Sequence, residues 1–190
     1  MEIIDIELDP VPIREETKDE WLRVFPWRSP SSAPVGLKDV IAGKSLCDIG
    51  CAEGDMINQF SKHAESVVGI EMDPDRFSVA INRGLTVKVG NFFRIPNAEF
   101  PVCDVYYLWG PSPQSSMLMV DHLMAHPKVK EGAIILSAGR TGAPHVEKSV
   151  KKWDGKVLAI PYEEWNEDLE RVESGKWWVG VIEKKTGVHV

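Results

Sequence analysis

Short apolar runs alternate with segments of helical periodicity between Lys44 and Gly139. Strands that are buried on both faces read as continuous apolar runs, and parallel strands need crossover helices between them. The pattern therefore predicts an α/β fold with a mostly parallel sheet. The expected strands are SLCDIG, SVVGIEM, LTVKVG, DVYYLWG and GAIILSAG, and the expected helices cover 55–64, 74–83 and 115–125.

The rhythm changes after Gly139. KVLAIPYEEW and KWWVGVIEKK are expected to form an antiparallel strand pair that closes the sheet, joined by an acidic connection over 163–173. A chain of 190 residues fits a single globular domain. We expect the folded domain over 44–190, preceded by a proline-rich segment over 1–43 with one helix at 15–24. The acidic start of that segment is interpreted as a candidate lid.

The formal charge of -7 belongs mostly to one end of the chain. Residues 1–20 hold eight acidic and two basic side chains, so the remaining residues are close to neutral. Nucleic acid is therefore not the favoured partner. Seven bases and three acids over 128–156 are interpreted as a solvated face, with contact to an anionic substrate as the alternative. The sequence lacks an apolar run of about 18 residues and a basic signal-like start, so we expect no membrane association and a cytoplasmic protein.

Cysteine and histidine residues give little support for a metal site. Cys47, Cys51 and Cys103 are interpreted as small buried hydrophobic residues, because their spacing fits no metal-binding pattern. His122 and His126 are four residues apart in an expected helix, which would let them face one ion. No third ligand accompanies them in a recognised pattern, so we expect no metal.

A glycine turn, CDIGCAEGD, ends the first expected strand. Gly50 and Gly54 allow backbone conformations and close ligand approach that a Cβ would prevent. Glu71 ends the next strand, and a carboxylate there can accept hydrogen bonds from ribose hydroxyls. The spacing is G-x-A-x-G rather than the G-x-G-x-x-G of dinucleotide folds, and Glu53 and Asp55 would repel a pyrophosphate. The two features together indicate an adenosine-type ligand that carries positive charge.

These segments resemble the class I S-adenosylmethionine-dependent methyltransferases over about residues 44–139, with a continuation to 184. Four segments match in order, at 48–54, 69–73, 89–92 and 104–109. The resemblance implies a three-layer Rossmann-like fold with a seven-stranded, mostly parallel sheet, and S-adenosyl-L-methionine as the cofactor. Ala52 stands where the family commonly has glycine, and Asn91 where it often has aspartate.

The resemblance also implies roles for individual residues. Asp48 and Gly50 would lie near the methionine portion, Glu71 at the ribose, Met72 against the adenine face, and Asn91 with Phe92 at the adenine edge. Core packing is the alternative for Met72 and Phe92. The full set of implied cofactor-binding residues is Asp48, Gly50, Cys51, Ala52, Gly54, Glu71, Met72, Asn91, Phe92 and Trp109.

The acceptor is not identified by the sequence. Methyl transfer is a direct displacement, which needs alignment and exclusion of water more than acid–base groups. Open α/β sheets bind ligands beyond the carboxyl ends of the strands, so the candidate acceptor-site residues are Trp109, Pro111 and Arg140. Packing is the alternative role for Trp109, and a surface role for Arg140. Trp109 stands at the end of the strand where an amine acceptor would lie, and its indole cannot accept hydrogen bonds from an amine. Methylation of the amino groups of nucleic-acid bases is therefore disfavoured. A small molecule and a protein side chain both remain open.

Two other functions compete with methyl transfer. The first is a noncatalytic protein of the same fold that binds S-adenosylmethionine or a nucleotide, because a fold does not fix a function. The second is a nicotinamide-dependent dehydrogenase, which the glycine spacing disfavours. The sequence does not indicate an oligomeric state.

Overall fold

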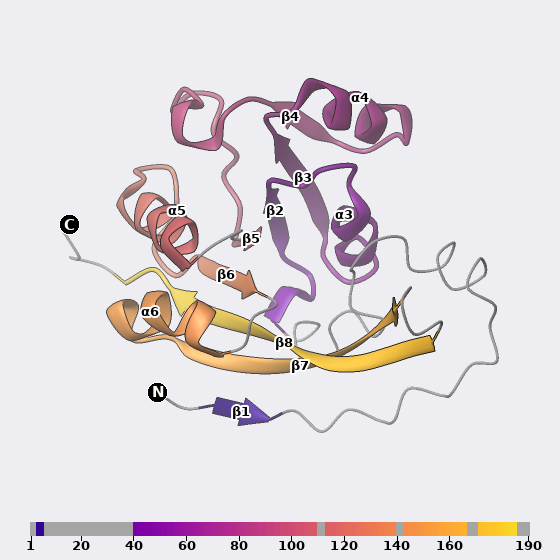
Figure 1. Cartoon of the computed structure of the whole chain (residues 1–190). Coiled ribbons are helices and arrows are strands. Elements are labelled where there is room, and N and C mark those ends of the chain that lie inside the picture. Colours follow the sequence, from indigo (N-terminus) through magenta and orange to yellow (C-terminus); the bar gives the residue numbers. More distant parts are fainter. Residues whose placement is uncertain (1–2, 6–39, 110–112, 140–142, 167–170, 186–190) are drawn as a thin grey trace.

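A single sheet with helices on both faces organises the molecule (Figure 1). The structure, a computed structural model, describes residues 3–5, 40–109, 113–139, 143–166 and 171–185. Within these ranges the strand order is β1-β7-β8-β6-β5-β2-β3-β4. β8 runs antiparallel to both of its neighbours, and the other strand pairs are parallel. The predicted mostly parallel sheet is therefore confirmed.

Every strand and helix predicted between Lys44 and Gly139 is present. The strands are β2 (Ser45–Ile49), β3 (Ser66–Glu71), β4 (Val87–Val89), β5 (Val105–Trp109) and β6 (Ile134–Gly139). The helices are α3 (Asp55–Phe60), α4 (Pro74–Asn82) and α5 (Pro113–Ala125), with a short 3-10 turn, η1 (Phe92–Arg94). α4 begins where expected because the Asp73 side chain accepts hydrogen bonds from two backbone N–H groups of its first turn and Pro74 occupies its first position. α3 ends earlier than the predicted residue 64.

Outside the range from Lys44 to Gly139, the structure differs from the prediction in three ways. A helix that was not predicted, α6 (Ala143–Trp153), precedes β7 (Lys156–Asn166) and β8 (Arg171–Glu183). The antiparallel pair is confirmed, but the acidic connection expected over 163–173 is wrong, because most of it belongs to the two strands. Finally, β1 (Ile3–Asp5) pairs with the start of β7 and adds an eighth strand to the seven predicted.

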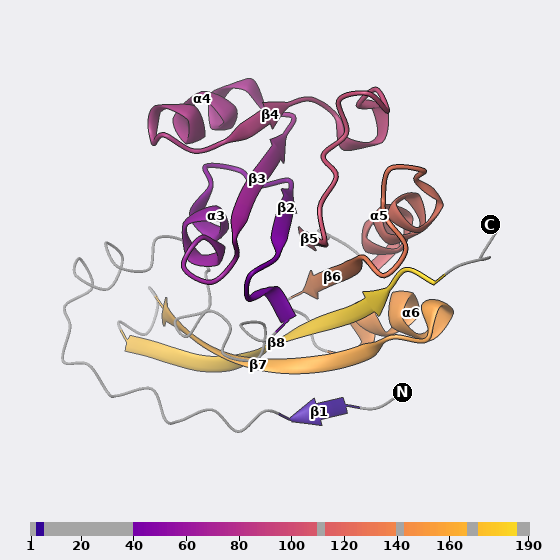
Figure 2. The ribbon, with the colours of Figure 1, turned by 180° about the vertical axis from the view of Figure 1, so that it is seen from behind.

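The far ends of β7 and β8 extend beyond the rest of the sheet (Figure 2). β6 pairs with β8 only up to Trp178, and β1 pairs with β7 only up to Ala159. Residues 160–166 therefore pair with 171–177 alone among the described residues, and we call this two-stranded ribbon the arm. Because the arm is not enclosed by further described strands, its sequence need not be apolar, which explains why its part over 163–173 was predicted to be a connection.

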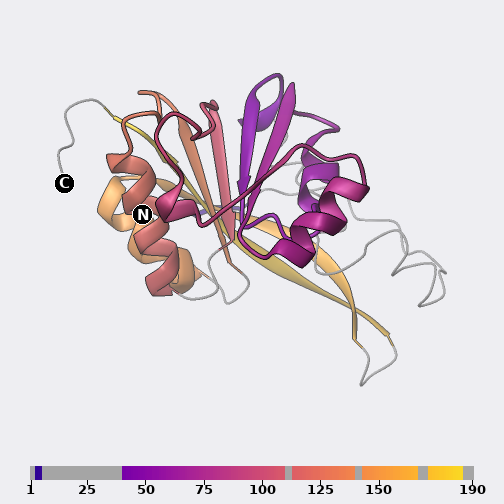
Figure 3. The same cartoon turned by 90° about the horizontal axis from the view of Figure 1, so that it is seen from above.

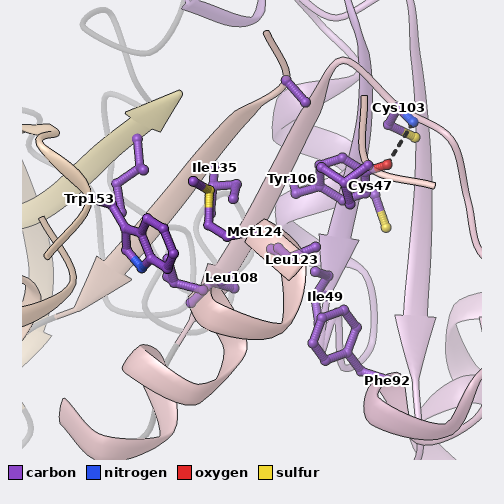
Figure 4. Packing of buried hydrophobic residues seen from close by; sticks show 14 of the residues in the cluster. Cys47, Ile49, Phe92, Cys103, Tyr106, Leu108, Leu123, Met124, Ile135 and Trp153 are labelled. Carbon is purple, nitrogen blue, oxygen red and sulfur yellow. Dashed lines mark hydrogen bonds between the residues drawn. The ribbon is translucent and has the colours of Figure 1, made fainter. Parts of the chain in front are cut away.

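Helices cover both faces of the sheet, as the view from above shows (Figure 3), and a layer of apolar side chains packs on each face. α5 and α6 cover one face, and α3 and α4 cover the other. The first layer contains Tyr106, whose hydroxyl donates to the Pro101 carbonyl (2.9 Å) and accepts from the Cys103 N–H (3.0 Å) (Figure 4). The predicted burial of all three cysteines is confirmed, and their thiols are free.

Two further predictions concern the N-terminal helix and membrane association. The helix expected at 15–24, and with it most of the proposed 1–43 segment, lies outside the described residues. Among the residues that the structure describes, no helix has the length and apolar character needed to cross a membrane.

Candidate functional site

The carboxyl ends of four strands meet at one edge of the sheet. Ile49 of β2 lies in register with Ile70 of β3 and with Leu108 of β5. Glu71, at the end of β3, lies in register with Val89 of β4. The turns that follow these strands therefore lie near one another at this edge, which is where open α/β sheets bind their ligands.

The turn after β2 is held against β3 by backbone hydrogen bonds. The N–H groups of Gly50 and Cys51 both donate to the Ile70 carbonyl, at 2.8 and 3.1 Å. Gly50 and Gly54 have φ angles of 74° and 86°, which favour glycine. A Cβ on Gly50 would meet nothing within 4 Å, whereas one on Gly54 would collide with the Leu85 side chain. Gly50 thus borders open space, while Gly54 is required for close packing.

Ala52 occupies the position of the turn where glycine was the family expectation. Its φ of 51° lies in the left-handed region, which costs about 1–2 kcal/mol for a residue with a Cβ. Its N–H donates to Glu71 Oε2 at 2.7 Å. Hydrogen bonds to an ionised acceptor are among the stronger ones in proteins, so this bond helps to offset the conformational cost.

The Glu71 carboxylate is fixed in orientation by backbone donors on both of its oxygens. Oε2 accepts from Ala52, and Oε1 accepts from the N–H of Asp73 at 2.8 Å. Glu71 is only 6% exposed, and its own carbonyl accepts from the Gly90 N–H at 2.8 Å. A carboxylate has about four acceptor positions, so two remain for the polar hydrogens of a ligand.

Asp48 is a buried carboxyl group, and among the described residues no ion pair to it is found. It is 2% exposed, and its Oδ2 has no hydrogen-bond partner. Burial, and then the negative charge of Glu71, raise the pKa of Asp48 to about 7. A carboxyl group in this setting either holds a proton or requires a positive ligand.

Tyr107 lies beside this carboxyl group and was missed by the sequence analysis. It is the β5 register partner of Asp48, and its buried ring packs edge-on against Phe60 at 4.8 Å between centroids. Burial, and then the charge of Asp48, raise its pKa. Both strands were predicted, but their pairing and register were not, so no sequence pattern placed Tyr107 beside Asp48.

The residues expected around an adenine ring fall into two groups. Met72 is 68% exposed at the end of β3, so the core alternative for it is wrong. Asn91 is also exposed, and its Oδ1 accepts from the Phe93 N–H at 3.0 Å, which caps η1. Phe92 is buried in the apolar layer under α5, so the core alternative is confirmed for this side chain. Contacts of these three residues with a ligand stay predictions.

The expected acceptor region is described only in part. Trp109 ends β5, pairs with Ala138 of β6, and is half-buried against the apolar layer that contains Leu136. Its packing role is therefore present, while a contact with an acceptor stays a prediction. Pro111 and Arg140 lie outside the described residues. Within the described ranges, no group of three or more potential ligands could hold a metal ion.

Comparison with known proteins adds evidence at the level of structure. No protein-family model and no curated protein matches the sequence. A solved structure concerned with the conversion of a disulfide bond into a thioacetal group in echinomycin biosynthesis is similar over 84% of both chains, with 15% identity and a TM-score of 0.62. A methyltransferase from Pyrococcus furiosus is similar over 78% of this chain and 79% of its own, with 15% identity and a TM-score of 0.57.

A third similar structure is the precorrin-6y C5,15-methyltransferase of Geobacter metallireducens. It covers 77% of this chain and 82% of its own, with 12% identity and a TM-score of 0.54. Identities at this level show the shared fold and leave the acceptor undetermined. The strand order and the similar structures together show that the chain has the Rossmann-like fold of methyltransferases.

Proposed function

We propose that the chain is an S-adenosylmethionine-dependent methyltransferase. The observation that carries this proposal is the Glu71 carboxylate, which is held by the N–H groups of Ala52 and Asp73 beside a turn where Gly50 borders open space. A fixed acceptor next to an open approach fits a ribose. The methyltransferase fold supports the same choice of ligand.

The other parts of the site fit the rest of this cofactor. Asp48 supplies a buried carboxyl group whose Oδ2 has no hydrogen-bond partner among the described residues, and the cofactor carries a sulfonium and an ammonium group. Exposed Met72 supplies an apolar surface for an adenine ring, and the Asn91 turn lies next to it across the end of β3. When bound, the cofactor supplies an activated methyl group to a nucleophile.

The contribution of this chain is then binding, orientation and exclusion of water. Glu71, held by the N–H groups of Ala52 and Asp73, would accept hydrogen bonds from the ribose hydroxyls through its remaining acceptor positions. Asp48 favours the positively charged cofactor over its neutral sulfur product, because an ionised carboxylate attracts the sulfonium charge. Trp109, at the end of β5, forms an apolar wall next to which an acceptor can lie. The acceptor is a small molecule or a protein side chain.

Thermal stability with different ligands tests the proposed cofactor. A ligand at 100 times its Kd adds about 2.7 kcal/mol to the free energy of unfolding. We expect S-adenosylmethionine and S-adenosylhomocysteine to raise the Tm and NAD to leave it unchanged. A rise with NAD alone, or with none of the three, would overturn the assignment. Binding of the cofactor without transfer to a broad panel of small molecules and proteins would favour the noncatalytic alternative.

Replacement of Glu71 tests the residue that carries the proposal. Glu71→Ala removes a charged hydrogen-bond acceptor, so we expect about 10- to 100-fold weaker cofactor binding by titration calorimetry. The substitution also leaves the N–H groups of Ala52 and Asp73 without their acceptor, which lowers stability by about 1–3 kcal/mol. Glu65→Ala, exposed and next to the opposite end of β3, is the matched control and should leave affinity unchanged. Equal affinity of the two variants would contradict the ribose assignment.

A further inference from the structure

His122 of α5 contacts both aromatic rings of η1. Its imidazole centroid lies 4.8 Å from the Phe92 ring and 5.2 Å from the Phe93 ring, at interplanar angles of 73° and 71°. The two phenyl rings are themselves 5.1 Å apart and nearly perpendicular. One imidazole from α5 therefore packs against a pair of rings that follows directly after β4.

This ring pair is joined to the proposed adenine site through the backbone. Asn91 precedes it, and its Oδ1 accepts from the Phe93 N–H, while its carbonyl accepts from the Arg94 N–H at 2.8 Å. The preceding residue, Gly90, donates its N–H to the Glu71 carbonyl. Displacement of the two rings therefore displaces the Asn91 turn. Phe93 is 48% exposed, and the ring contacts described for it are with His122 and Phe92.

The surroundings of His122 disfavour a positive charge. Burial lowers its pKa. The nearest titratable ring is His126, at 5.4 Å between centroids, whose pKa is also lowered, by burial first and then by the charges of His122, Lys184 and Lys128. The adjacent Asp121 carboxylate is engaged by the Lys152 ammonium at 2.8 Å and by the Trp153 indole N–H at 2.9 Å.

The charged residue that η1 contributes is Arg94, which is also positive. An imidazolium at position 122 would therefore lose solvation beside a second imidazole, with the neighbouring carboxylate already engaged. Attraction between the imidazolium and a phenyl ring acts in the opposite direction, by about 0.5–1 kcal/mol at exposed sites. The experiment below separates these two effects, because they predict opposite changes in the Asn91 turn on acidification.

We propose that His122 is a positioning residue: its neutral ring holds Phe92 and Phe93, and with them the Asn91 turn, in the arrangement that receives the cofactor's adenine. Protonation of His122 loosens this turn and weakens cofactor binding. The second step rests on the proposed function, whereas the loosening of the turn does not.

Hydrogen exchange tests the loosening without any ligand. We expect the protection factors of the Phe93 and Arg94 amides to fall between pH 8 and pH 5.5 in the wild-type chain, after correction for the intrinsic exchange rate. In His122→Phe, which keeps an aromatic ring but cannot be protonated, they should not change. His63→Phe removes a histidine next to α3 and is the matched control, so it should behave as the wild type.

Cofactor affinity tests the second step. We expect the ratio of the S-adenosylhomocysteine Kd at pH 5.5 to that at pH 8 to be about two- to threefold larger in the wild type than in His122→Phe, because a difference of half a unit of pKa between free and bound protein changes the Kd by about threefold at most. Asp48 titrates in the same range, but it is common to both proteins and cancels in this comparison. Absence of binding to the wild type at every pH would refute the proposed function and leave the exchange experiment valid.

Two results would overturn the role of His122. One is an equal pH dependence of the Phe93 and Arg94 protection factors in the wild type and in His122→Phe. The other is tighter protection at pH 5.5 than at pH 8, which would mean that the imidazolium is held by the phenyl rings. Should His122→Phe fail to fold, the wild type alone provides the test. NMR titration gives the pH at which the His122 ring is protonated, and the protection factor of the Phe93 amide must fall at that same pH.

Discussion

The two halves of the sheet carry different kinds of burial. On the side of β2 and β3, the structure buries two carboxyl groups, Asp48 and Glu71, and places Gly50, Ala52 and Gly54 in left-handed conformations. On the side of β5, β6 and β8, the interior is dominated by fully buried apolar side chains under α5 and α6, among them Leu123, Ile135, Val150 and Ile182. The first half holds the strained backbone and the buried carboxyl groups beside apolar side chains of its own, such as Leu46 and Ile70, whereas the buried polar groups of the second half are serine hydroxyls and one imidazole.

A cavity in the apolar half should have the largest effect on stability and little effect on the site. Leu123→Ala removes a fully buried side chain, so we expect the free energy of unfolding to fall by about 2–5 kcal/mol. Leu118→Ala, on the same helix but at a side chain that is 62% exposed, should change it by about 0.5 kcal/mol or less. Urea unfolding measures both. A large loss of cofactor affinity in folded Leu123→Ala would show that the two halves are not separable.

Asp48 should link both stability and cofactor binding to pH, with opposite signs. Its pKa rises from 3.8 to about 7 on folding, so between these values the folded chain keeps a proton that the unfolded chain has lost. Stability therefore falls as pH rises from 4 to 7. Cofactor affinity should rise through pH 7, because only the ionised carboxylate attracts the cationic ligand.

Asp48→Asn removes the titrating group and separates these effects. We expect the variant to lose the part of the stability slope between pH 4 and pH 7 that Asp48 contributes, as measured by chemical unfolding at a series of pH values. It should also lose the preference for S-adenosylmethionine over its neutral product at pH 8. A variant with the same two pH profiles as the wild type would mean that Asp48 contributes to the pH dependence of neither stability nor cofactor binding.

Ala52 should give the smallest effect. Ala52→Gly relieves the left-handed strain but adds freedom to the unfolded chain, so stability should change by about 1 kcal/mol or less. Ala138→Gly, in a fully buried position of β6, has only the second effect and loses a packed methyl group. Thermal unfolding should therefore show Ala138→Gly to be clearly less stable than Ala52→Gly. The reverse order of stabilities would mean that the left-handed conformation of Ala52 does not strain the turn.

Much of the first half of the sheet could be predicted from the sequence, for a physical reason. Parallel strands buried on both faces must be apolar throughout, and a glycine turn and an acid must follow β2 and β3 if they are to hold a ribose. These requirements fix both the elements and the main candidate residues. The second role of Glu71, as acceptor for the N–H groups of Ala52 and Asp73, needed the three-dimensional arrangement.

The C-terminal elements were harder to predict because their constraints are weaker. The signal for α6 was present, since Val146, Val150 and Trp153 follow helical spacing, but the lysines between them led to its interpretation as a solvated face. Among the described residues no third strand pairs with the arm, so its sequence need not follow the pattern of a buried strand. The contact of His122 with η1 joins segments that are distant along the chain, and no local pattern indicates it.

The position of β8 has a consequence for the order in which the sheet can fold during synthesis. β8 lies between β6 and β7, so the last strand of the sheet is inserted between two strands that precede it in the chain. Among the described residues, β6 and β7 do not pair with each other, and β7 joins the main sheet through β8. A nascent chain emerging from the ribosome can therefore pair β2 to β6 while β7 still awaits its partner. The sheet becomes continuous only after Glu183 has been added, so the terminal strand acts as the closing step of folding.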